Sequence, residues 1–124
     1  MTSPMVFVSD KVPQYCKPIT EVIKKYVVSE NTDLRVKHFV AKNGNEVTKY
    51  TLPRNNHSLL VVLDPNQDSL SILIKRSGRH ASTLPIVAYE TGMNNPNLDV
   101  ALLDFMEVFV SKAFNQRKDV EKWT

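Results

Sequence analysis

The chain has 124 residues, of which 42% are apolar, and carries a formal net charge of +3 at pH 7. This length predicts one domain, residues 1–124, with a hydrophobic core of its own. The longest wholly apolar run, residues 59–63, is far shorter than the ~20 residues of a membrane-spanning helix, so we expect no membrane segment. The first ten residues lack the basic region of a signal peptide, and the single cysteine, Cys16, has no partner for an internal disulfide. Both observations favour a cytoplasmic location.

Residues 13–29 are predicted to form the first helix. Pro18 suits a first helical turn, and apolar residues recur at the spacing of one helix face, namely Ile19, Val22, Ile23, Tyr26 and Val27. Before this helix, residues 5–8 are a candidate for an extra strand at the edge of a sheet.

Residues 34–41 and 46–52 predict a first β-hairpin, because they flank the turn dipeptide Asn43-Gly44. Asn-Gly is typical of a two-residue type I′ turn, which places Lys42 opposite Asn45. Counting back from that turn pairs Phe39 with Thr48 and Lys37 with Tyr50. We therefore expect four side chains to share one face of the sheet: Arg35, Lys37, Phe39 and Tyr50.

Residues 58–63 and 69–75 predict a second hairpin, joined by a four-residue loop between Asp64 and Ser69. One face then carries only core residues, in the pairs Leu63/Leu70, Val61/Ile72 and Leu59/Ile74. The other face carries the pairs Val62/Ser71, Leu60/Leu73 and Ser58/Lys75, so it is half apolar. Leu60, Val62 and Leu73 therefore need cover from a helix or from another subunit.

A fifth strand at a sheet edge is predicted for residues 85–89, since proline suits the start of a strand. Asn95 is the expected N-cap of a last helix, residues 96–115, with Pro96 at its first position. The fold class is thus α+β, with an N-terminal helix, an antiparallel β-meander of four to five strands and a long C-terminal helix.

Sequence motifs for catalysis, cofactors or metals are missing. The loop that starts at Asp64 opens like a calcium-binding loop, but Ser69 and Lys75 occupy the positions that need glycine and a bidentate carboxylate. The histidines, His38, His57 and His80, have no cysteine or carboxylate at metal-ligand spacing, and no local sequence activates Cys16. We expect a protein that is not an enzyme, with no catalytic residue, cofactor or metal. A pocket containing two of these histidines, or one with Cys16, would revive the enzyme hypothesis.

The half-apolar face of the second hairpin carries the leading hypothesis for function. It predicts a small non-enzymatic interaction or regulatory protein that binds a protein partner, as a homodimer, through Leu60, Val62 and Leu73. A compact accessory protein of a virus or phage would fit this description.

The alternative hypothesis is a single-stranded DNA- or RNA-binding protein. Residues 34–80 hold eight Lys or Arg against three acids, a net +5, and cations interleaved with aromatic rings are what such proteins use. The candidate nucleic-acid-binding residues are Arg35, Lys37, Phe39, Tyr50, Lys75, Arg76 and Arg79.

Overall fold

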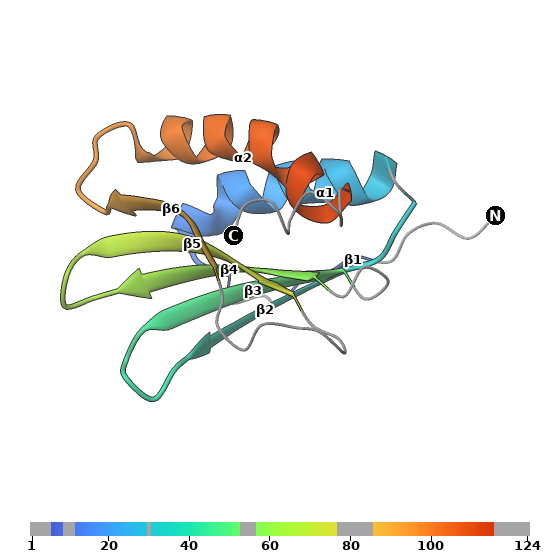
Figure 1. Cartoon of the computed structure of the whole chain (residues 1–124). Coiled ribbons are helices and arrows are strands. Elements are labelled where there is room, and N and C mark those ends of the chain that lie inside the picture. The colour runs from blue at the N-terminus through green and yellow to red at the C-terminus, as the bar shows by residue number, and fades with distance from the viewer. Residues whose placement is uncertain (1–5, 9–11, 30, 53–56, 77–85, 116–124) are drawn as a thin grey trace.

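A computed structural model of the chain describes residues 6–8, 12–29, 31–52, 57–76 and 86–115. They form one six-stranded sheet, and the helices lie together on one of its faces (Figure 1). The elements in chain order are β1 (Val6–Val8), the 3₁₀ turn η1 (Gln14–Cys16), α1 (Lys17–Ser29), β2 (Leu34–Val40), β3 (Glu46–Leu52), β4 (His57–Asp64), β5 (Ser69–Arg76), β6 (Ile86–Gly92) and α2 (Leu98–Asn115). The α+β prediction is confirmed.

The six strands lie side by side in chain order. β2 to β6 form an antiparallel meander, whereas β1 pairs in parallel with β2, Val6 lying opposite Leu34. Parallel neighbours need a crossover connection, and α1 lies in the connection between β1 and β2. The edge strand expected near residues 5–8 and the fifth strand of the meander are both present, the latter as β6.

The first helix begins with a 3₁₀ turn and ends with a left-handed residue. Its first turn is the 3₁₀ segment η1, and Pro18 lies in the first turn of α1 as expected. Beyond α1, Asn31 adopts a left-handed conformation with φ 51°. The N–H of Asn31 donates to the Val28 carbonyl (3.2 Å) and that of Thr32 to the Val27 carbonyl (3.0 Å), the bonding pattern of a Schellman motif.

The predicted register of the first hairpin is wrong by one residue. Its loop has three residues, not two, because the N–H of Ala41 donates to the Asn45 carbonyl (2.8 Å) and Gly44 takes φ +90°. This is the three-residue hairpin loop that needs a left-handed residue at its last position. Lys37 consequently lies opposite Lys49, and Tyr50 lies opposite Val36. A slip of one residue exchanges the faces of a whole strand, so Tyr50 is on the other face from Lys37.

The predicted register of the second hairpin is confirmed pair by pair, from Leu63 opposite Leu70 to Ser58 opposite Lys75. In its loop, Asp64 Oδ1 accepts the N–H of Asn66 at 2.9 Å. The carboxylate that opens the calcium-like sequence is therefore used by its own turn.

The hydrophobic core lies between the sheet and the helix pair. On α2, Leu102, Met106 and Val110 are buried, and the ring of Phe105 stacks on Tyr89 of β6 with centroids 4.6 Å apart. The last helix begins at Leu98, two residues after the predicted start at Pro96, and Asn95 Oδ1 accepts the N–H of Asn97 at 2.9 Å in the turn that precedes it. Over the described part of the chain, neither helix has the length and hydropathy of a membrane span.

Candidate binding face of the sheet

The face of the sheet that is turned away from α1 and α2 is called here the open face. Strand residues alternate between the two faces, so the open face is built from the neighbours of the core residues. On β2 and β3 these are Arg35, Lys37, Phe39, Val47, Lys49 and Thr51; on β4 and β5 they are Ser58, Leu60, Val62, Ser71, Leu73 and Lys75.

Apolar side chains occupy the middle of the open face. Leu60 lies opposite Leu73, and Val62 lies opposite Val47. Val47 lies in turn opposite Phe39, whose side chain is 39% exposed. The three residues predicted as a protein interface, Leu60, Val62 and Leu73, thus share this face and are half-buried. The corrected register of the first hairpin adds Phe39 beside them, and Val47, whose side chain is buried at 6% exposure.

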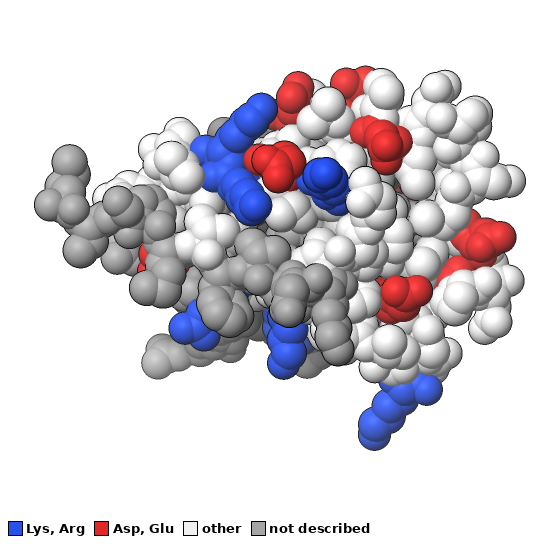
Figure 2. All heavy atoms as spheres, turned by 180° about the vertical axis from the view of Figure 1, so that it is seen from behind, with Lys and Arg blue, Asp and Glu red and all other residues white. Residues whose placement is uncertain are grey.

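Cations lie on the side of this apolar centre that is away from the loop between β4 and β5. Lys37 lies directly opposite Lys49, and Arg35 and Lys75 end a row that runs through Thr51 and Ser58. Like charges directly opposite each other destabilise a sheet, so the Lys37–Lys49 pair is unfavourable for the isolated fold. In the view from behind, Lys and Arg side chains protrude along the lower edge of the molecule, where the sheet lies (Figure 2).

The carboxylates on the open face lie at one end of it. Alternation along β4 and β6 places Asp64 and Glu90 on this face, next to the loop between β4 and β5. Neither shares a cross-strand row with Arg35 or Lys37. The remainder of the face is therefore positive.

The alternative nucleic-acid-binding set is only partly brought together. Arg35, Lys37, Phe39 and Lys75 lie on the open face, and the structure adds Lys49. Tyr50 does not belong to this set, because its side chain is fully buried under α1 and has no face available for stacking on a base. The backbone of Arg76 pairs with His57 at the end of β5, and Arg79 lies outside the described residues.

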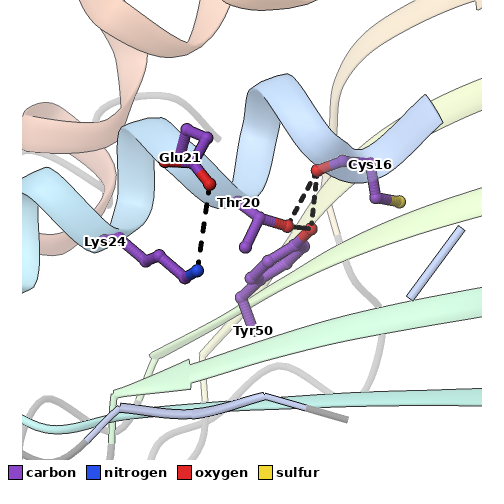
Figure 3. A network of polar contacts seen from close by, with 5 residues as sticks. All are labelled: Cys16, Thr20, Glu21, Lys24 and Tyr50. Atoms are coloured by element: carbon purple, nitrogen blue, oxygen red, sulfur yellow. Dashed lines mark hydrogen bonds and ion pairs between the residues drawn. The ribbon is translucent and has the colours of Figure 1, made fainter. Parts of the chain in front are cut away.

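Tyr50 takes part in a polar network between β3 and the start of α1 (Figure 3). Thr20 Oγ1 donates to the Cys16 carbonyl at 2.8 Å and lies 2.6 Å from the Tyr50 hydroxyl, which also lies 3.3 Å from that carbonyl. These bonds satisfy a tyrosine hydroxyl inside an apolar core. The ion pair drawn nearby, Glu21 with Lys24 at 3.8 Å, lies on the exposed side of α1.

Cys16 and His38 both lie near Thr48, which makes this network the nearest approach to a catalytic arrangement. His38 Nδ1 lies 2.9 Å from Thr48 Oγ1, and its Nε2 lies 3.5 Å from Glu46 Oε1. Burial, however, raises the pKa of the Cys16 thiol from 9.0 to about 11, against the opposing effect of the Thr48 and Tyr50 hydroxyls. A neutral, fully buried thiol is a poor nucleophile, so the arrangement supports a structural role.

Metal binding finds no support in the part of the chain that the structure describes, where no three His, Cys, Asp or Glu side chains are grouped for a metal ion. The side chain of His57 and the whole of His80 lie outside it.

Compared with protein-family models, with curated proteins and with solved structures, the chain matches none.

Proposed function

We propose that the protein is a non-enzymatic binding protein whose open face docks a protein partner. The observation that carries this proposal is the position of both helices on one face of the sheet, with Leu60, Val62 and Leu73 on the other. A patch of apolar side chains with a polar rim has the anatomy of a protein–protein interface. A cytoplasmic location is part of the proposal, because a lone free thiol suits a reducing compartment.

The charge of the open face indicates the chemistry of its partner. Arg35, Lys37, Lys49 and Lys75 favour a partner segment that combines carboxylates with apolar side chains. A homodimer formed by two open faces would bring these cations of both copies together. The expected homodimer is thus disfavoured in that face-to-face form.

Selection of peptides from a random library against the protein tests the open face as a docking surface. We expect the selected peptides to contain both acidic and apolar residues. They should bind the double variant Leu60→Ser/Leu73→Ser at least tenfold more weakly, a loss of about 1.4 kcal/mol, because the apolar centre is gone while the cations remain. The affinities are measured by fluorescence anisotropy of the labelled peptides.

A matched control is Val28→Ser, since Val28 is 62% exposed on α1 and away from the open face. This variant should bind the selected peptides as the wild type does. Peptides that bind all three proteins equally would contact another surface and would contradict the proposal.

Single-stranded nucleic acid is the second candidate for the open face, favoured by its four cations and by the 39% exposed ring of Phe39. If phosphates bind there, Lys37→Glu/Lys49→Glu should weaken binding to all sequences alike. The double variant should also reduce the slope of log K against log salt by about 1.4, since each lost phosphate contact on a single strand contributes about 0.7.

Anisotropy of a mixed-sequence oligonucleotide at several salt concentrations measures both effects. Lys25→Glu on the exposed side of α1 is the control and should change neither quantity appreciably. Absence of saturable binding of the wild type at low salt would exclude this candidate.

A further inference from the structure

The outer side of α2 carries an unusual combination of exposed residues. Every described side chain that α2 turns to solvent is either acidic or apolar, namely Asp99, Val100, Leu103, Asp104, Glu107 and Val108. Val100 and Val108 are 58% and 65% exposed, and Leu103 is 37% exposed. No Lys or Arg occurs between residues 98 and 110. This surface, called here the α2 ridge, is therefore an amphipathic acidic helix face with nothing packed on it among the described residues.

The α2 ridge has the chemistry that the open face requires of a partner. Acidic residues on the ridge match Arg35, Lys37, Lys49 and Lys75, and the exposed aliphatic residues match the apolar centre around Leu60 and Leu73. Helix-on-sheet packing is also how the other face of this sheet is covered.

The two surfaces lie on opposite sides of the molecule. In Figure 1 the helices form one layer and the sheet the other. Seen from behind, several acidic side chains appear along the top of the molecule, with Lys and Arg side chains near them, and further cations protrude along its lower edge (Figure 2). The ridge of a chain therefore cannot reach the open face of that same chain.

We propose that the α2 ridge of one copy docks on the open face of a second copy, so that the chain assembles head to tail. This inference rests on the proposed docking role of the open face and names its occupant. Because the two contacting surfaces differ, the contact is heterologous and leaves a free ridge at one end and a free open face at the other. Such a contact builds a ring or a filament, and not the closed two-fold dimer expected from the sequence.

A charge-swap experiment tests this assembly. The ridge variant is Asp104→Lys/Glu107→Lys, and the face variant is Lys37→Glu/Lys49→Glu. In either variant alone, both contacting surfaces have the same sign, so we expect at least a tenfold higher protein concentration to be needed for association. In an equimolar mixture, each ridge meets an open face of opposite sign, so association should return.

Sedimentation velocity over a concentration series, at low salt and at 0.5 M salt, measures the assembly of the full chain. Wild type should form species larger than dimers as its concentration rises, and salt should reverse the association because exposed charges are screened. Circular dichroism and thermal melting check that both variants are folded, as expected for changes at solvent-accessible positions. The double variant Lys24→Glu/Lys25→Glu on neighbouring α1 is the control and should assemble as the wild type does.

Three outcomes would overturn the inference. The wild type could remain monomeric at every concentration, the ridge variant could associate as strongly as the wild type, or the mixture of variants could fail to associate. The peptide selection described above does not depend on self-assembly. If the protein stays monomeric but its open face binds the selected peptides, the proposed function stands. Only the second copy is then excluded as the occupant of that face.

Discussion

Leu59→Ala is expected to lower the free energy of unfolding by about 3 kcal/mol, whereas Leu60→Ala at the next position should lower it by about 1 kcal/mol. The two leucines are neighbours on β4 and point to opposite faces. Leu59 is fully buried between the sheet and the helices, so its truncation leaves a cavity in the core. Leu60 is half-buried on the open face, where water reaches the truncated site. Urea denaturation of both variants at low protein concentration measures the difference.

The same comparison on β5 provides the matched control. Ile72 is fully buried and lies opposite Val61, while Leu73 lies opposite Leu60 on the open face. Ile72→Ala should resemble Leu59→Ala, and Leu73→Ala should resemble Leu60→Ala. If Leu60 and Leu73 proved as sensitive as their neighbours, both would belong to a second core, and the open face would lose its apolar binding surface.

The second hairpin shows how far local sequence can determine a register. Its loop is bounded by Asp64 and Ser69, and only one pairing places Leu59, Val61 and Leu63 opposite apolar partners. Loop length and burial therefore agree, and the prediction that Leu60, Val62 and Leu73 share a face followed from them.

The first hairpin shows where local sequence fails. Asn43-Gly44 suits a two-residue loop, but a glycine with positive φ suits the last position of a three-residue loop equally well. The signal that decides between them is burial. Along β3, the buried residues Tyr50 and Leu52 alternate with Lys49 and Thr51. Only the three-residue loop places Tyr50 and Leu52 opposite core residues of β2. The alternation of apolar and polar residues along β3 therefore predicts the face of Tyr50 better than the Asn-Gly dipeptide does.

The sequence does not predict which face of the sheet each helix covers. An amphipathic helix shows that one of its faces is buried, but not which face of a two-sided sheet it covers. Because β1 and β2 are parallel, the chain must cross over one face of the sheet between them, and α1 lies in this crossover. The second helix, α2, then packs beside α1. This arrangement, and not a residue pattern, leaves Leu60, Val62 and Leu73 without a helix.

Alkaline pH is expected to destabilise the fold strongly through ionisable groups near the start of α1. Burial raises the pKa of Cys16 from 9.0 to about 11. Burial also raises the pKa values of Tyr50 and Tyr15, and the nearby Cys16 and Glu46 charges add to the effect on Tyr15. Each group therefore holds its proton more tightly in the folded chain than in the unfolded one.

The sign of the effect follows from this difference in proton binding. A raised pKa contributes stability that is fully present below the unfolded pKa and is lost as the pH rises towards the folded pKa. Between pH 9 and 10 the Cys16 thiol alone should lower the free energy of unfolding by about 1 kcal/mol, and by about 2 kcal/mol in all by pH 11. Above pH 10 the two tyrosines should make the decline steeper.

Urea denaturation at pH 7, 9, 9.5, 10 and 10.5 measures this loss, and Cys16→Ala separates the thiol from the tyrosines. The variant should be less stable than the wild type at pH 7, because Cys16 fills a fully buried position. Its stability should then change less between pH 9 and 10, where the thiol contributes more to the loss than either tyrosine because its unfolded pKa is lower. Equal slopes for the two proteins in that interval would mean that the thiol ionises as readily in the folded protein as in the unfolded one. The thiol would then be open to water and able to act as a nucleophile, and the His38–Thr48 contact would become a candidate catalytic arrangement.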